Sequence, residues 1–337
     1  MPHNRLIPFL CCILFLGGTQ IGAAQKVFKI SSQAPERSIW GKALIKIARN
    51  VSAATDGEVE FKIFHGGVQG DEQTVLRKMR VKQLHGAGFI GQGLSIINPD
   101  ALALTLPALF ESQEEFEYVL DAVGAEISQA CAKKGYQVLS YPQLGYAFAF
   151  SRDPIHSIDD LKSSKPWLIQ GDVMSSELFD VLDVSPVSAS VGEVLPALNS
   201  GMIRLVFSPP TAVIAMQWHD KLSFRLSREI IPTMGVLLVD LERWNTLPRE
   251  TQKKVQKIVD REITRLNKAV LKTNDKAIEV LERRGMETIQ VNDELAQIVI
   301  DASEQVAKRL VDKAFSKSFH DRVLKSAAEY REKNAGK

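Results

Sequence analysis

Residues 165–172 read KPWLIQGD, and this stretch decides how the rest of the chain is interpreted. Its apolar centre predicts a short buried strand that ends at Gly171. Asp172 can then cap a helix, and residues 173–182 have the composition of that helix. The end of a strand beside the start of a helix is a common ligand site in α/β proteins. We therefore expect Trp167, which lies in this strand, to be close to a bound ligand.

Upstream of this stretch the chain predicts a β-α-β unit. Residues 27–30 and 59–63 alternate as strands do, and residues 39–48 have apolar side chains at helical spacing. This order of elements implies a parallel sheet. The glycine-rich residues 66–70 do not match a phosphate-binding loop, so they predict a turn.

The later part of the chain predicts further strands and three helices. Residues 137–141 and 145–151 are expected to be paired extended segments that cross from one lobe to another, and residues 234–240 a return strand. Residues 249–284 contain no Pro or Gly and have apolar residues every three to four positions, which predicts one very long helix. Residues 293–313 and 315–330 predict two more helices.

The composition indicates a soluble protein of one or two domains. The chain has 337 residues, of which 45% are hydrophobic and 24% charged, so it can bury a large core. The formal net charge of +2 gives no strong field for nucleic acid or an anionic membrane, and no nucleic-acid partner is expected.

The first 24 residues have the pattern of a secretory signal. Arg5 precedes an apolar segment, residues 6–16, and small residues at 22–24 form a cleavage site. The apolar segment is short for a membrane span, although an uncleaved anchor is the alternative. Cys131 is the one cysteine after this segment, so no internal disulfide is expected.

The sequence argues against an enzyme. It lacks a Gly-x-Ser-x-Gly elbow, a His-Glu-x-x-His motif and a Cys/His cluster, and its histidines are scattered. The adjacent Asp159 and Asp160 are placed to cap a helix rather than to face one substrate. We therefore expect no catalysis, no cofactor and no metal site.

Several short motifs agree in order and spacing with one family. They are PIHSIDDLK at 154–162, Leu-Pro-x-Leu-Phe at 106–110 and Trp-x-x-Leu-Pro at 244–248. Together they resemble the substrate-binding receptors of TRAP transporters, the DctP-type periplasmic proteins, over nearly all of the chain from Val27 onward. The resemblance implies a periplasmic receptor that closes over a ligand and hands it to a membrane permease.

The resemblance also implies an α/β fold like that of type II periplasmic binding proteins. Such a fold has two lobes with central mixed sheets, crossing strands and a long spine helix. The first lobe is expected to comprise residues 25–147 and 234–275. The second is expected to comprise residues 148–233 and 276–330.

The chain departs from this family at the positions that hold the ligand. Typical members have an Arg where this chain has Trp167, and often a second Arg at the position of Ala147. A buried carboxylate without a paired cation has a desolvation cost of several kcal/mol. Trp167, Ala147, Phe207 and Tyr146 would instead form an apolar and aromatic lining, which predicts a hydrophobic or amphiphilic ligand.

The polar groups Gln92, Gln170 and Ser208 are expected to fix a polar part of that ligand. The Trp-containing variant also resembles a TRAP subgroup that is paired with tetratricopeptide-repeat proteins, for which the resemblance implies apolar or lipid-like ligands. The full set of expected ligand-binding residues is Gln33, Phe89, Gln92, Tyr146, Ala147, Trp167, Gln170, Phe207, Ser208 and Met234.

Other interpretations remain open from the sequence. Trp167 could belong to the core only, and Arg204 could hold an anion if it faces the cleft. The protein would then be a receptor for an organic acid. A third possibility is a periplasmic adaptor or sensor subunit that has lost ligand binding.

Overall fold

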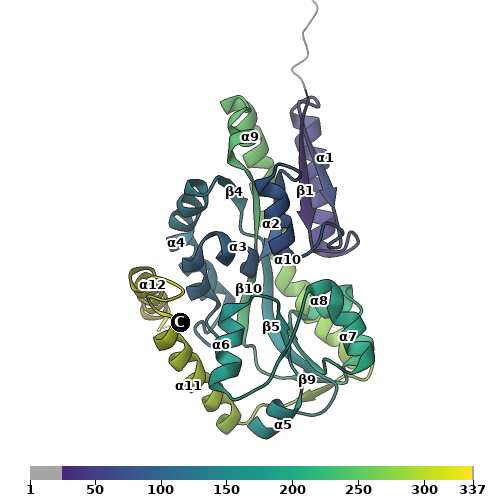
Figure 1. The fold of residues 1–337 in the computed structure, drawn as a ribbon, viewed down its shortest axis with the longest axis vertical. Coiled ribbons are helices and arrows are strands. Elements are labelled where there is room, and N and C mark those ends of the chain that lie inside the picture. The colour runs from purple at the N-terminus through teal and green to yellow at the C-terminus, as the bar shows by residue number, and fades with distance from the viewer. Residues whose placement is uncertain (1–24, 336–337) are drawn as a thin grey trace, which may run out of the picture.

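The computed structural model describes residues 25–335, so the expected signal segment lies outside the described residues. These residues form a mixed α/β fold with one large sheet and one small one (Figure 1). The strands are β1 Lys26–Ser32, β2 Val59–Phe64, β3 Gly86–Ile90, β4 Tyr136–Ser140, β5 Gln143–Ser151, β6 Trp167–Ile169, β7 Val187–Ala189, β8 Leu205–Ser208, β9 Phe224–Leu226, β10 Ile231–Asp240 and β11 Glu287–Ile289.

The helices surround the large sheet. The α-helices are α1 Ile39–Ala54, α2 Glu72–Arg80, α3 Gly91–Ile97, α4 Gln113–Lys133, α5 Ile158–Ser163, α6 Val173–Val181, α7 Val194–Ser200, α8 Pro210–Ala215, α9 Leu241–Asn245, α10 Arg249–Arg283, α11 Asp293–Leu310 and α12 Lys317–Asn334. The 3-10 helices are η1 Pro99–Thr105, η2 Val191–Glu193 and η3 Trp218–Lys221.

The large sheet has the strand order β11-β9-β5-β10-β3-β1-β2, with β4 beside β10 and β8 beside β5. β1 is parallel to β2 and β3, as the β-α-β pattern predicts, whereas β10 is antiparallel to β3 and β5. β6 and β7 form the small parallel sheet. The predicted mixed α/β fold with crossing strands is confirmed.

The prediction that residues 137–141 pair with residues 145–151 was wrong. β4 and β5 both pair with β10, one after the other along its length. The two residues between them, Tyr141 and Pro142, do not turn the chain back, so it continues along β10. β5 then pairs with β8 and β9, and β5 and β10 together connect the two halves of the molecule (Figure 1).

Side chains of β10 alternate between two cores. Val236 belongs to the core that α2, α3 and α4 cover, and Leu237 to the core that α1 and α10 cover. The long helix α10 contacts α1, β4, β5 and α8, so it packs against both halves of the molecule. Its predicted length is confirmed. The helix can be this long because no Pro or Gly interrupts it.

Asn274 of α10 links the crossing strands to the second half of the molecule. Its buried side chain donates from Nδ2 to the Leu144 carbonyl at 2.9 Å and accepts from the Thr211 amide at 3.0 Å. Gly145 lies beside it with φ +90°, and a Cβ there would lie 2.2 Å from the Asn274 Nδ2 atom. One side chain thus joins β5, α8 and α10.

Replacing Asn274 with leucine should lower the free energy of unfolding by about 2–4 kcal/mol, because two partly buried backbone groups would lose their partners. Urea unfolding followed by circular dichroism measures this change. Lys276→Leu, at an exposed position of the same helix, is the matched control and should change stability by less than about 0.5 kcal/mol. Equal effects of the two substitutions would contradict the role of Asn274.

Candidate functional site

A cavity of about 270 Å³ lies beside the crossing strands. Its wall includes the ends of β1 and β3, parts of α1 and η1, the start of α6, the β8–α8 connection, and β10. A cavity of about 150 Å³ is large enough to hold benzene, so this one can hold a considerably larger molecule. The cavity therefore brings together segments that are far apart in the sequence.

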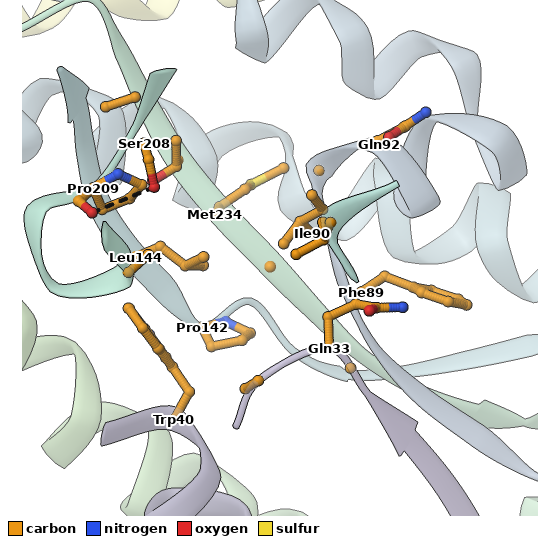
Figure 2. Close-up of a pocket in the computed structure, with 18 of the residues that line it drawn as sticks. Gln33, Trp40, Phe89, Ile90, Gln92, Pro142, Leu144, Ser208, Pro209 and Met234 are labelled. Atoms are coloured by element: carbon orange, nitrogen blue, oxygen red, sulfur yellow. Dashed lines mark hydrogen bonds between the residues drawn. The ribbon is translucent and has the colours of Figure 1, made fainter. Parts of the chain in front are cut away.

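Eight of the ten expected ligand-binding residues line this cavity. They are Gln33, Phe89, Gln92, Ala147, Trp167, Phe207, Ser208 and Met234. Figure 2 shows Ser208 beside Pro209 at one side and Met234 and Ile90 in the middle of the labelled residues. Gln170 lines a small neighbouring pocket of about 20 Å³, which it shares with Gln33 and Gln92.

Tyr146 does not line the cavity. Successive side chains of a strand point to opposite faces, so Tyr146 faces away when Ala147 faces the cavity. It lies in a core with Phe148 and Phe150, and its hydroxyl has no hydrogen-bond partner among the described residues. Burial raises the pKa of Tyr146 above its usual value.

Trp167 belongs both to a core and to the cavity wall. Its indole Nε1 donates to the Ala189 carbonyl at 2.9 Å, so the polar atom of the ring has a partner. The ring packs edge-to-face on Trp218 with centroids 5.3 Å apart, and both residues line the cavity. The two aromatic rings therefore form a continuous apolar wall.

The cavity wall has little charge. Among the described residues it contains no Lys, Arg or His, and Asp172 is its one ionisable side chain. The Asp172 carboxylate caps α6, accepting from the Ser175 amide at 3.1 Å and the Ser175 hydroxyl at 2.5 Å. Burial raises the pKa of Asp172 above its usual value. The wall thus offers no cation to a carboxylate ligand.

Arg204 and Arg225 both contact residues outside the cavity wall. Arg204 donates from Nε to Asp153 at 2.8 Å and does not line the cavity. Arg225 lies over the ring of Phe148, and its Nη2 atom is 3.6 Å from Glu282. Arg204 therefore does not face the cavity as an anion clamp in this structure.

Polar contacts join the two halves of the molecule beside the cavity. The Gln92 side chain, in α3, donates from Nε2 to the carbonyl of Gln170 in the turn after β6. In that turn Gly171 has φ +84°, and a Cβ there would lie 2.6 Å from the Gln73 Nε2 atom. The strand end and helix start predicted at residues 165–172 are confirmed, with Gly171 between them.

Glu72 is a buried carboxyl group next to this contact. Its Oε1 atom accepts from the Ile90 amide at 2.6 Å, at the start of α3, and its Oε2 atom has no partner among the described residues. Burial raises the pKa of Glu72 to about 8, and the Ile90 amide opposes that shift in part. Asp71, not Glu72, caps α2.

Sequence reasoning missed the part of the wall that comes from α1 and α10. The spacing of Trp40, Ala43 and Leu44 on α1 and of Ile263 and Leu266 on α10 indicated only a buried helix face. Within residues 25–335, no group of three or more His, Cys, Asp or Glu could hold a metal ion. No helix among these residues is long and apolar enough to span a membrane.

Residues 30–314 match the family model described as bacterial extracellular solute-binding protein, family 7 (DctP). A solute-binding protein of Chromohalobacter salexigens is 30% identical over 165 residues, which are 48% of this chain and 49% of that protein. A solute-binding protein of Roseobacter denitrificans is 21% identical over 90% of this chain and 95% of that protein.

Solved structures of similar fold are TRAP periplasmic solute-binding proteins or sugar acid binding proteins. The one from Xanthobacter autotrophicus, with bound β-D-galacturonate, has a TM-score of 0.83 and 20% identity over 89% of this chain and 99% of that chain. The one from Advenella mimigardefordensis, with galactonate, has a TM-score of 0.84 and 18% identity over 90% and 98%. At these identities the likeness shows the fold alone.

Proposed function

We propose, because the chain belongs to family 7 (DctP) of the bacterial extracellular solute-binding proteins, that it is a periplasmic TRAP-type receptor for a hydrophobic or amphiphilic small molecule. As a member of this family it is a solute-binding protein and not an enzyme. The proposed ligand class distinguishes it from the Xanthobacter and Advenella proteins, which hold sugar acids.

One observation supports this ligand class most directly: no Lys, Arg or His lines the cavity in the described part of the chain. An anion in this cavity would lose its water without gaining a cation, at a cost of several kcal/mol. An apolar ligand would gain roughly 25 cal/mol for each Å² of surface that it buries against rings such as Trp167 and Trp218.

The ligand would lie between two lobes that open and close. We propose that one lobe comprises residues 25–147 and 234–275 and the other residues 148–233 and 276–330. The boundaries lie where the Thr233 hydroxyl donates to the Gly145 carbonyl and where Asn274 contacts both β5 and α8. The closed receptor would then deliver the solute to the membrane subunits of a TRAP permease. A tetratricopeptide-repeat partner remains a prediction.

The ligand class is testable with protein purified without denaturant. Native mass spectrometry should show a co-purifying apolar or amphiphilic mass, and calorimetry should show no binding of β-D-galacturonate at millimolar concentration, because the cavity wall has no cation. Micromolar binding of an organic acid would overturn the proposal in favour of the organic-acid receptor. Failure to bind either class would favour the adaptor.

Arg204→Gln is a matched control in that experiment. Arg204 pairs with Asp153 away from the cavity, so this substitution should leave the affinity for the ligand unchanged. If an organic acid binds and Arg204→Gln abolishes its binding, Arg204 is the anion clamp and the apolar ligand class is wrong.

A further inference from the structure

The cavity reaches the cores on both faces of β10. Met234 and Leu237 both line it, although Met234 belongs to the core beside α3 and Leu237 to the core beside α1 and α10. Gly235 lies between them in the wall, where a Cβ would lie 2.7 Å from the Phe89 carbonyl oxygen. The pairing of β10 with β5 is also irregular between Thr233 and Met234. The cavity thus borders residues of both cores beside this irregular pairing.

The end of the cavity beside the core of α1 and α10 is apolar. Leu44 of α1, Leu237 of β10 and Ile263 and Leu266 of α10 are each less than a tenth exposed. Trp40 adds its ring, and its Nε1 atom is occupied by a hydrogen bond to the Gln143 carbonyl at 3.1 Å. We call this end the inner chamber; its wall consists of Trp40, Ala43, Leu44, Pro142, Leu237, Ile263 and Leu266.

The other end of the cavity, near the contact between Gln92 and Gln170, carries several polar groups. Gln33, Gln92, Asp172 and Ser175 line it there. In Figure 2, Trp40 and Gln92 lie on opposite sides of the labelled residues, with Met234 and Ile90 between them. The cavity is therefore asymmetric, with a polar end at the contact between the lobes and an apolar end inside the first lobe.

We propose that the inner chamber receives a straight apolar tail of the ligand, while an uncharged or cationic head stays at the end near Gln92 and Asp172. This inference rests on the proposed function and adds the shape and polarity of the ligand. A carboxylate head is disfavoured because the Asp172 carboxylate is the one ionisable group of the described wall. The volume of 270 Å³ suits a ligand on the order of ten non-hydrogen atoms, because a cavity of about 150 Å³ holds benzene.

A series of 1-alkanols from butanol to decanol tests the inner chamber by isothermal titration calorimetry. The affinity of the native protein should rise about threefold to fourfold for each added methylene, until the tail fills the chamber, and then level off. The chain length at which it levels off measures the depth of the chamber.

Two opposite substitutions in the chamber should move that length. Ala43→Leu adds three carbon atoms to a residue of the wall and should shorten the limiting alkanol by about three carbons. Leu266→Ala removes three and should lengthen it by about three. Ala48→Leu makes the first change five residues further along α1, outside the cavity wall, and should leave the limit unchanged. Circular dichroism confirms that each variant is folded.

The possible results separate the two proposals. Shifts in opposite directions, with no shift in Ala48→Leu, support the inner chamber. An unchanged limit in the folded chamber variants overturns the chamber but leaves the apolar receptor standing, since the alkanols still bind. If no alkanol of the series binds to the native protein, the apolar receptor itself is overturned, and the inner chamber with it.

Discussion

Replacing Trp167 with alanine should lower the free energy of unfolding by about 3–5 kcal/mol, as large-to-small changes of buried aromatic residues do. Trp167 is 7% exposed and would lose both its packing on Trp218 and its hydrogen bond to the Ala189 carbonyl. Because its ring also lines the cavity, affinity for the apolar ligand should fall about tenfold to a hundredfold. Urea unfolding and calorimetric titration measure the two effects.

Trp167→Phe separates packing from hydrogen bonding. Phenylalanine keeps an aromatic ring in the wall but removes the indole donor, and the Ala189 carbonyl still accepts from the Gln170 amide at 3.3 Å, so the change should cost about 0.5–1.5 kcal/mol of stability. The loss of affinity should be smaller than for alanine. If Trp167→Ala destabilises the protein but leaves ligand affinity intact, Trp167 is a core residue only.

Replacing Glu72 with glutamine should change how stability depends on pH. The pKa of this buried carboxyl is about 8 in the folded protein against 4.5 as its ordinary value. Between these values the folded state retains a proton that the unfolded state has released, so stability falls as pH rises, by about 1.4 kcal/mol per unit. Below pH 4.5 both states are protonated, and this penalty is absent.

Glutamine has no proton to release, so Glu72→Gln should gain stability relative to the native protein as pH rises from 5 to 8, on the order of 4 kcal/mol in total. Chemical unfolding at several pH values gives the difference curve. Glu279→Gln, at an exposed position of α10, is the control and should give a flat curve. A flat curve for Glu72→Gln as well would mean that Glu72 is ionised in the folded protein.

The sequence predicted those elements that depend only on residues close together in the chain. Gly171 and Asp172 mark a strand end and a helix start because of their backbone and capping chemistry, and both act in this way in the structure. The length of α10 followed from the absence of Pro and Gly. The pairing of β4 with β10 rather than with β5 could not be predicted in this way, since the partner of a strand comes from a distant part of the chain.

The site was only partly predictable for a related reason. A regular apolar spacing such as that of Trp40 and Leu44 shows that a helix face is buried, but not whether it borders a void. Tyr146 was expected in the lining together with Ala147, but its side chain packs in the core that contains Phe148 and Phe150 instead. The absence of Arg at Trp167 and Ala147, where the resemblance implies it, was visible in the sequence, and it led to the proposed ligand class.

The position of β10 along the chain has a consequence for how the protein folds. β10 is the strand between β3 and β5, and α10, which directly follows α9, packs on both halves of the sheet. Residues 25–230 alone therefore lack the strand that holds the two halves together. A nascent chain should therefore stay open until the start of its last third, which contains β10, has been synthesised.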